Sequence, residues 1–415
     1  MKQTHPAVSK LQLTLLVSML SMIGPFTIDT YLPAFESMEQ DFDVSRTLMT
    51  QTLGAYLMAF AISTLVWGAI TDWIGRKPVI LVALGSYFLA SIACALATSY
   101  EQFLLFRFLQ GLGIGGSLIS GRAMVRDLLD TKDAQKVMAK AMMLFAISPV
   151  IAPIIGGWLH SAFGWRSIFW FLSFYAASVF LFALLSARES LAKNNRNSIH
   201  IHKVSLVYLS TLSKPHYLRL VFILATAFSS FFLYVAGAPT LLFDVLHLQP
   251  TQFYILFIPV VTGIMLGAFL SNQLISRYTN RQMINIFLSM MLVIAAINLT
   301  LSLSLKASLA TLLIPLALYS LSLATIMPIL SIMIIDCFPK NRGAASAMQS
   351  FIHMGFNSIS VSFIVALLGA SLANFATAQI ALVSIAFLLW LIDIKYASKS
   401  NGSSAERSRS TPPTY

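Results

Sequence analysis

Charged residues are scarce in this chain. Its 415 residues include 27 Lys and Arg and 15 Asp and Glu, so that 10% are charged, whereas 57% are hydrophobic. Almost all of the charges fall in short gaps between apolar runs of about 18–25 residues, and about 20 apolar residues suffice for a helix to cross a bilayer. The composition excludes a soluble globular domain and predicts a membrane protein that crosses the bilayer many times.

Cysteine and the common catalytic motifs are also nearly absent. Cys94 and Cys337 lie in or beside apolar runs without a ligand cluster, so neither a disulfide framework nor a metal site is indicated. The chain has no P-loop, metalloprotease helix or nucleophile elbow. Gly111, Gly113 and Gly116 match the dinucleotide-binding spacing, but no strand precedes them, and small residues within an apolar helix permit close packing. We expect no cofactor and no enzymatic activity.

Apolar runs long enough to cross the bilayer recur twelve times between Leu11 and Tyr396. Their expected bounds are 11–35, 47–69, 79–97, 102–124, 135–159, 166–187, 218–242, 252–274, 283–304, 309–333, 344–369 and 374–396. We therefore predict an all-α polytopic membrane protein with twelve transmembrane helices in two six-helix pseudo-symmetric bundles. The predicted parts are an N-terminal bundle (1–187), a cytoplasmic linker (188–217), a C-terminal bundle (218–396) and a disordered cytoplasmic tail (397–415).

The distribution of Lys and Arg predicts the orientation. Arg46, Arg166 and Lys306 are the basic residues in the gaps on one side, and the other side carries most of the rest. Because basic residues near span ends are retained in the cytoplasm, both termini should be cytoplasmic. The net charge of +12 then reflects topology and attraction to anionic lipid, without a nucleic-acid partner. The first run continues to Leu32 without a small-residue cleavage site, which favours a transmembrane helix over a signal peptide.

Two ionisable residues lie well inside the expected spans of the first half. Asp29 is the acid placed deep in a span, where an ionised carboxylate costs about 2.5–3.5 kcal/mol, so it should face a cavity and carry protons. The alternative is a carboxylate that caps a helix broken near Pro25 and Pro33. Arg107 is permanently charged and cannot carry the proton, but it can weaken proton binding by a nearby acid. The alternative for Arg107 is structural pairing with backbone carbonyls.

Polar and aromatic residues in the spans supply candidate substrate contacts. Gln349, His353 and Asn357 recur every four residues and so form one stripe on a helix. Tyr31 and Tyr234 are further candidates, since aromatic side chains suit a pocket for flat or lipophilic ligands. The alternatives are a packing histidine between helices and ordinary core or lipid-facing aromatic residues.

The gap between the second and third spans contains a dense motif, Gly68-Ala-Ile-Thr-Asp72-Trp-Ile-Gly75-Arg76-Lys77-Pro78. A tight turn there needs Gly75 for its backbone, while Asp72 and Arg76 can pair with charges at neighbouring helix ends. In the fifth span, Pro149, Pro153, Gly156 and Gly157 should bend and thin the helix, so that it packs closely against the other half. We expect both segments to take part in conformational gating. The alternative for the first is a plain turn whose positive charges only set the topology.

The turn motif resembles the loop 2–3 signature of the major facilitator superfamily. Further segments resemble the drug:proton antiporters of its bicyclomycin-resistance/CflA group: Asp29-Thr-Tyr31-Leu32-Pro33-Ala34, Arg107-Phe-Leu-Gln110-Gly111, Gly121-Arg122-Ala123-Met-Val125-Arg126-Asp127 and Ser148-Pro149-Val-Ile-Ala152-Pro153-Ile-Ile-Gly156-Gly157-Trp158. These matches cover residues 26–170 well, and the second half offers weaker ones.

The resemblance implies several roles. Arg107 would tune or gate protonation, the fifth span would seal the interface against leak, and Arg126 and Asp127 would join the gating residues. Drug/proton antiporters elsewhere in the superfamily often carry another acid about two turns before Asp29, where this chain has Ser21, which argues against a two-acid exchange scheme. The membrane would be the bacterial inner membrane.

The sequence thus predicts a monomeric secondary transporter in the lipid bilayer that works by alternating access. It would export small lipophilic or amphipathic compounds in exchange for protons. One alternative is an exporter dedicated to a native metabolite such as a siderophore or amino-acid derivative. Two further alternatives, a transporter-derived sensor and an intramembrane enzyme, lack a signalling domain and a convergent catalytic set, respectively.

Overall fold

The computed structural model describes residues 9–192, 194, 196 and 201–409, and for residues 201–205 and 397–409 it gives the backbone alone. Within these residues every regular element is helical, and twelve helices are long and apolar enough to cross a membrane. The predicted fold class is confirmed.

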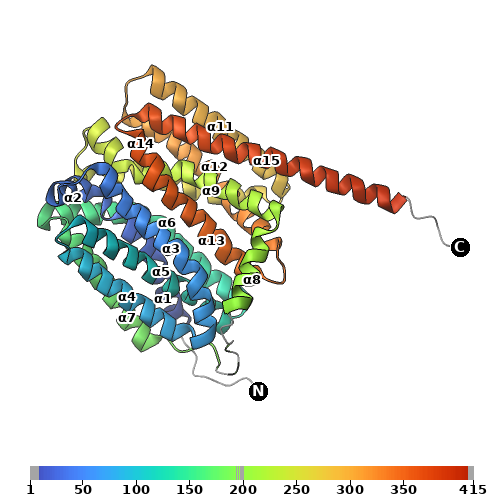
Figure 1. Cartoon of the computed structure of the whole chain (residues 1–415), viewed down its shortest axis with the longest axis horizontal. Coiled ribbons are helices and arrows are strands. Elements are labelled where there is room, and N and C mark those ends of the chain that lie inside the picture. The colour runs from blue at the N-terminus through green and yellow to red at the C-terminus, as the bar shows by residue number, and fades with distance from the viewer. Residues whose placement is uncertain (1–8, 193, 195, 197–200, 410–415) are drawn as a thin grey trace.

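The helices of the first half form one bundle, coloured blue to green in Figure 1. They are α1 (Lys10–Asp29), η1 (Leu32–Ala34), α2 (Phe35–Phe42), α3 (Arg46–Ile74), α4 (Arg76–Leu96), α5 (Tyr100–Leu128), α6 (Thr131–Phe163) and α7 (Arg166–Ser186). Within the bundle α5 packs between α3 and α4, and α1 packs along α6.

The second half repeats this arrangement. Its helices are α9 (Pro215–Ala236), η3 (Thr240–Val245), η4 (Pro250–Gln252), α10 (Tyr254–Leu274), α11 (Asn280–Ser304), α12 (Leu309–Asp336), α13 (Arg342–Ile359), η5 (Ser360–Val365), α14 (Ala366–Leu368) and α15 (Leu372–Arg409). Here α12 packs between α10 and α11, as α5 does between α3 and α4, whereas α9 packs more against α15 than against α13, the counterpart of α6. The two halves meet mainly along α3 with α13 and α6 with α10, so the interface between them runs along these four helices.

Most transmembrane helices are longer than the apolar runs that predict them. Several of their N-termini are capped by hydroxyl or carboxylate side chains. Ser45, Ser99, Asp130 and Ser308 each accept a hydrogen bond from the backbone N–H three residues later. The helices therefore begin among the polar residues that flank the apolar runs. In sequence such flanks are indistinguishable from loop.

Three transmembrane segments are interrupted where the halves face each other. The first ends its regular helix at Asp29 and continues through η1 and α2, with Pro25 inside α1 and Pro33 in η1. The seventh ends in the π-helical η3, and the eleventh becomes π-helical in η5. Irregular backbone of this kind is common at functional sites in membrane proteins.

The predicted linker contains a further helix, α8 (Ile201–Leu212), and α9 already begins at Pro215 within it. Tyr208 on α8 donates a hydrogen bond to the Leu65 carbonyl oxygen of α3 (3.0 Å). Burial, and to a lesser extent the charge of Asp72, raises the pKa of the Tyr208 hydroxyl, which therefore keeps its proton for this bond. The linker is thus attached to the first half as well as to the second.

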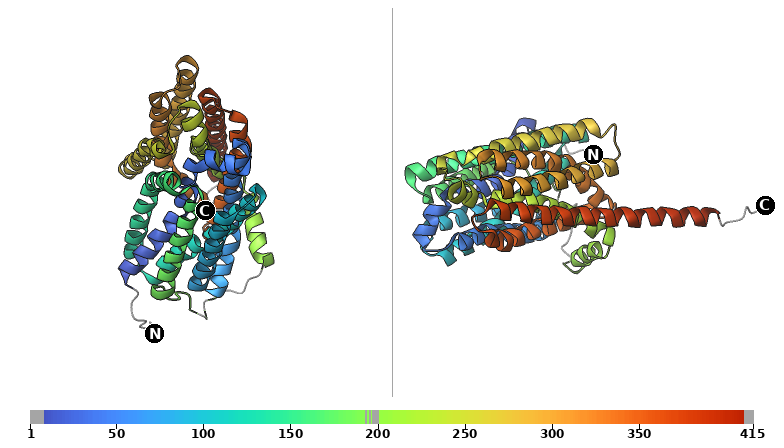
Figure 2. Two further views of the ribbon diagram at one scale, coloured as in Figure 1. Left: turned by 90° about the vertical axis from the view of Figure 1, so that its left-hand side faces the viewer. Right: turned by 90° about the horizontal axis from the view of Figure 1, so that it is seen from above.

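For the tail, which the sequence predicts to be disordered, the structure gives helical backbone over residues 397–409. Helix α15 continues without a break to Arg409 and projects from the bundle as the long red helix of Figures 1 and 2. No proline interrupts the chain between Tyr396 and Pro412, and a helix that already exists gains one backbone hydrogen bond with each added residue. Residues 410–415 lie outside the described part of the chain.

Candidate functional site

Asp29 occupies the break between α1 and η1. It is 4% exposed, and within the described residues its carboxylate has neither an ion pair nor a hydrogen bond. Its neighbours are held firmly: the Thr27 hydroxyl bonds the Tyr87 hydroxyl (2.6 Å), and the Thr30 hydroxyl donates to the Phe26 carbonyl oxygen (2.6 Å). This segment therefore presents a buried carboxylate without a polar partner, in a place where an ionised form is costly.

Arg107 lies on α5 and is completely buried. Its Nη1 donates to Gln110 Oε1 (2.5 Å) and its Nη2 donates to the Thr27 carbonyl oxygen (3.4 Å). The guanidinium carbon lies 4.2 Å from the ring centre of Tyr31 and 4.8 Å from that of Tyr56. The charge is held by aromatic faces and two oxygen acceptors, an arrangement that suits a guanidinium better than an ammonium group.

Arg107 contacts the short segment of chain that carries Asp29, but the two charged side chains do not touch each other. Thr27 and Tyr31, which contact Arg107, are four residues apart and share one helical face, whereas Asp29 lies two residues from each and so points elsewhere. No ion pair joins the two charges in the described part of the chain. Any influence of Arg107 on Asp29 therefore acts through the electric field of the guanidinium charge or through a change of conformation.

The candidate substrate residues fall into three environments. Tyr31 is fully buried over Arg107. Tyr234 belongs to a buried triad in which Asn298 Nδ2 donates to both the Tyr234 hydroxyl and Gln379 Oε1, at 2.7 Å each. Gln349 exchanges hydrogen bonds with Ser331 of α12. These three side chains have polar partners within the protein.

His353 and Asn357 differ from them. The imidazole of His353 packs edge-on against the Phe228 ring of α9, with 4.7 Å between ring centres. In the described structure, His353 Nε2 and Asn357 Oδ1 are buried without a hydrogen-bond partner. The Ser360 hydroxyl, which the sequence analysis missed, is in the same condition. Ser360 lies seven residues beyond His353, so extending the stripe of Gln349, His353 and Asn357 by one helical turn would have included it.

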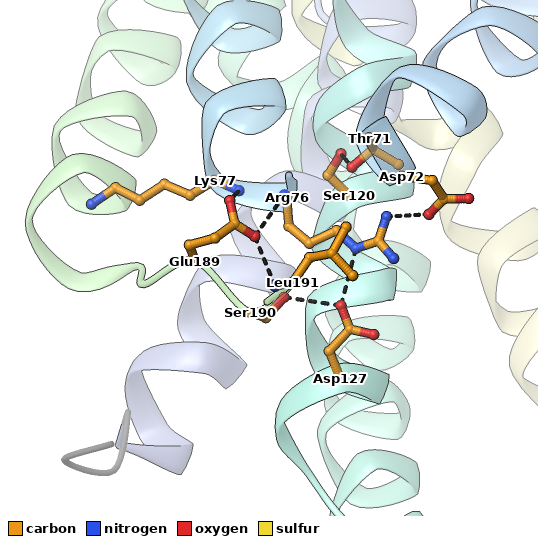
Figure 3. A network of polar contacts seen from close by, with 9 residues as sticks. All are labelled: Thr71, Asp72, Arg76, Lys77, Ser120, Asp127, Glu189, Ser190 and Leu191. Carbon is orange, nitrogen blue, oxygen red and sulfur yellow. Dashed lines mark hydrogen bonds and ion pairs between the residues drawn. The ribbon is translucent and has the colours of Figure 1, made fainter. Parts of the chain in front are cut away.

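The turn motif forms the network of Figure 3. Gly75 adopts φ +113°, a backbone conformation that favours glycine. Arg76 pairs with Asp72 and, through Nε, with Asp127 Oδ2 (3.0 Å). Gly68 lies one turn before Asp72 in open surroundings, and Arg126 is exposed on α5 outside this network. The predicted pairing of Asp72 and Arg76 with neighbouring helix ends is therefore present, with α5 as the neighbour.

Glu189, which follows α7, is a further member of this network that sequence reasoning missed. Its carboxylate accepts hydrogen bonds from the backbone N–H groups of Arg76 (2.9 Å) and Lys77 (3.3 Å), at the start of α4. A carboxylate there satisfies free N–H groups and complements the helix dipole. No sequence signal links Glu189 to the motif, because more than a hundred residues separate them.

The two glycines of α6 are sites of close backbone approach. A Cβ atom at Gly156 would lie 1.8 Å from the Thr30 carbonyl oxygen of α1, and one at Gly157 would lie 2.7 Å from the Pro250 carbonyl oxygen of η4. Pro149 and Pro153 both lie inside this helix. At Gly157, therefore, α6 packs directly against the second half, and Gly156 lies beside the segment that carries Asp29.

Comparison with known proteins places this arrangement in a large family. The family model of the Major Facilitator Superfamily matches residues 14–355. A bicyclomycin resistance protein homolog of Haemophilus influenzae is 26% identical over 275 residues, which cover 66% of this chain and 69% of that protein. Multidrug resistance protein D of Escherichia coli is 31% identical over 167 residues, or 40% of this chain and 42% of that one. The crystal structure of a D-xylose–proton symporter matches with a TM-score of 0.72 and 14% identity over 92% of this chain and 97% of that one, which is a likeness of fold.

Proposed function

Since the chain belongs to the major facilitator superfamily and is a transporter with twelve spans, we propose that it is a proton-coupled antiporter that exports small lipophilic compounds, drugs among them, by alternating access. Two of its relatives are named as a bicyclomycin resistance protein homolog and a multidrug resistance protein, which supports drugs as substrates. The asymmetry of Lys and Arg supports a bacterial inner membrane topology with both termini in the cytoplasm. We expect a monomer whose partners are substrate, protons and lipid.

The proposal rests on Asp29, a buried carboxylate with no ion pair in the described structure. Taking an ionised carboxylate out of water is costly, so Asp29 favours its protonated form while it is buried and can release the proton when water reaches it. A proton that moves down the membrane potential gains about 2.3 kcal/mol per 100 mV, which can sustain roughly a 50-fold substrate gradient.

Arg107 supplies the fixed positive charge of this scheme. Its aromatic and carbonyl contacts hold it on the same α1–η1 segment as Asp29, but on a different face. A movement that turns this segment would change the distance between the two charges and hence the ease with which Asp29 loses its proton. We assign Arg107 the role of tuning proton release.

The substrate would contact the second half through His353, Asn357 and Ser360. Buried polar atoms are nearly always hydrogen-bonded, so three consecutive exceptions on one helical face favour a ligand or water there. Phe228, which packs against His353 and stacks on Phe232 with 5.8 Å between ring centres, offers aromatic surface beside them. This polar face also favours the second candidate function, export of one hydrogen-bonding metabolite such as a siderophore or an amino-acid derivative.

The network at the start of α4 and the close contacts of α6 would act as gating elements. Asp72, Arg76 and Asp127 tie α3, α4 and α5 together at the end that we assign to the cytoplasm. Gly156 and Gly157 bring α6 against both α1 and the second half at the other end. Alternate making and breaking of such contacts is what alternating access requires.

The test is proton release from liposomes that carry the purified protein and a pH gradient. A panel of lipophilic cations, phenicols, bicyclic antibiotics and siderophores is added, and Asp29→Asn is compared with Asp336→Asn, which alters an exposed acid paired with Arg342. We expect several compounds to cause proton release, and Asp29→Asn alone to abolish it. Release by a single metabolite would favour the second candidate, and unchanged release from Asp29→Asn would refute the role of Asp29.

A further inference from the structure

The outer end of the molecule is the end that carries Arg46 and Arg166. Among the residues that the structure describes, one ion pair at this end crosses the interface between the halves. Arg46 is the first residue of α3 and lies between two acids. Its Nε contacts Glu39 of α2, and its Nη1 lies 3.2 Å from Asp244 Oδ2 of η3. Glu39 belongs to the first half and Asp244 to the second. One guanidinium therefore binds a carboxylate from each half.

The other outer ion pair stays within one half. Arg166 pairs with Asp41 (2.6 Å), and both residues belong to the first bundle. At the opposite end, the pairs of Arg76 remain within the first half, and those of Arg219 and Arg342 remain within the second. The ion pair across the interface thus belongs to the outer end, which is the closed end of this structure by the contacts that follow.

Backbone contacts close the interface near Arg46. Two turns into α3, the Gly54 carbonyl oxygen accepts a hydrogen bond from the Ser358 hydroxyl of α13 (2.7 Å). The Gly157–Pro250 approach joins α6 to η4, which follows Asp244 by a few residues. When the interface opens at this end, Asp244 must move away from Arg46, because the two residues lie on opposite sides of the interface.

We propose that Arg46 is a latch of the outer gate. It binds Asp244 when the outer end is closed and releases it whenever the transporter opens outward, while Glu39 holds the guanidinium in place throughout. Relative exposures support this division of roles, since the Glu39 side chain is 14% exposed and that of Asp244 is 40% exposed. A half-exposed ion pair is weak, which suits a contact that is made and broken in every cycle.

The proposal requires only that the chain alternates between two open states. It does not depend on which substrate is carried or on protons. The measurement is therefore the distance between the two halves at the outer end, in protein without substrate. Spin labels are attached to Thr98→Cys and Ser304→Cys, two exposed positions in different halves, in a background with Cys94→Ala and Cys337→Ala.

Asp244→Asn should raise the ratio of long to short label distances about 2–5-fold, which corresponds to the loss of one partly exposed ion pair. Arg46→Gln should do the same, and Asp244→Glu should restore the original ratio. Glu39→Gln should have a smaller effect, because the pair across the interface remains. Arg166→Gln is the matched control and should change nothing.

The latch is refuted if Asp244→Asn leaves the distance distribution unchanged, or if Arg166→Gln shifts it equally. The unfolding temperature of each variant separates an open gate from a damaged fold. Asp244→Glu and Asp244→Asn alter the same exposed side chain, so similar unfolding temperatures would assign a change in label distance to the gate. Because no substrate or pH gradient is present, a negative result here leaves the proposed antiport untouched, and failure of proton release in liposomes leaves the latch untouched.

Discussion

The two halves share a fold but bury different chemistry. In the described residues, the interior of the first half contains an acid and an arginine, Asp29 and Arg107. The second half contains amides, hydroxyls and an imidazole in the same region, and its buried acid, Asp393, is paired with Arg219 at the end opposite to Arg46 and Arg166. Two bundles of similar architecture can therefore divide the work, one handling charge and the other hydrogen bonding.

The largest effect should come from changing Arg107 to Lys. An ammonium group cannot reproduce the fork that reaches both Gln110 and the Thr27 carbonyl oxygen or lie flat over Tyr31. Loss of a buried cation–π contact and a charged hydrogen bond, each worth about 1.5–2 kcal/mol, predicts roughly a 100-fold fall in transport rate. The transport rate is measured as proton release from liposomes. Arg166→Lys, at an exposed cation, should retain the original rate, and equal losses in both variants would remove the distinction between interior and surface charge.

Gly156→Ala should come next. The added methyl group would meet the Thr30 carbonyl oxygen at 1.8 Å, and backbone cannot rotate aside, so α6 or the Asp29 segment must move. Overpacking of this kind costs about 1–3 kcal/mol of stability. Gly267→Ala is the counterpart in the second half, where the methyl group would lie 2.1 Å from the Leu321 carbonyl oxygen. We expect both to lower the thermal unfolding temperature, but only Gly156→Ala to impair proton coupling.

The control for both glycine variants is Gly68→Ala. Nothing lies within 4 Å of a Cβ atom at Gly68, although it belongs to the turn motif. Its unfolding temperature should not fall, and a helix interior should gain slightly from alanine. If Gly267→Ala impaired proton coupling as strongly as Gly156→Ala, the assignment of charge handling to the first half would lose its support.

Much of this arrangement follows from the sequence, for physical reasons. Apolar runs of bilayer length leave little freedom in the number of helices. A carboxylate or guanidinium inside such a run can be identified as a candidate functional residue from its position alone. Gly75 was predicted at the turn and has a positive φ there. These features depend on local sequence alone.

Other features depend on which face of a helix points inward. Helix α9 is apolar nearly all round, so its sequence has no period that distinguishes the side of Phe228 from the side of Tyr234. The sequence therefore placed Tyr234 among the candidate substrate residues without indicating that its hydroxyl lies beside Asn298 and Gln379. Glu189 and Asp244 were missed because their partners lie more than a hundred residues away in the chain.

Asn357→Leu should separate the hydrogen-bonding surface from the aromatic one. Its unpartnered Oδ1 would be lost without leaving a cavity, so stability should change little. We expect about a 10-fold weaker binding of chloramphenicol, which carries hydroxyl and amide groups, and unchanged binding of tetraphenylphosphonium, which carries none. Phe228→Ala should weaken both. Equal weakening of the two ligands by Asn357→Leu would argue against a polar contact with substrate.

The smallest effect should come from Asn298→Leu, which breaks the hydrogen bonds among Tyr234, Asn298 and Gln379 in the second half. Here Nδ2 donates to the Tyr234 hydroxyl and to Gln379 Oε1, and both residues are fully buried. Without Asn298 the Tyr234 hydroxyl would lose its donor, and Gln379 Oε1 would keep only the longer bond from Tyr234 (3.4 Å). Hydrogen bonds between membrane helices contribute on average about 0.6 kcal/mol, which predicts a modest fall in the unfolding temperature. Transport and ligand binding should persist, because these polar groups bind one another. If Asn298→Leu weakened chloramphenicol binding as Asn357→Leu does, the substrate surface would extend beyond His353, Asn357 and Ser360 and would include the triad of Tyr234.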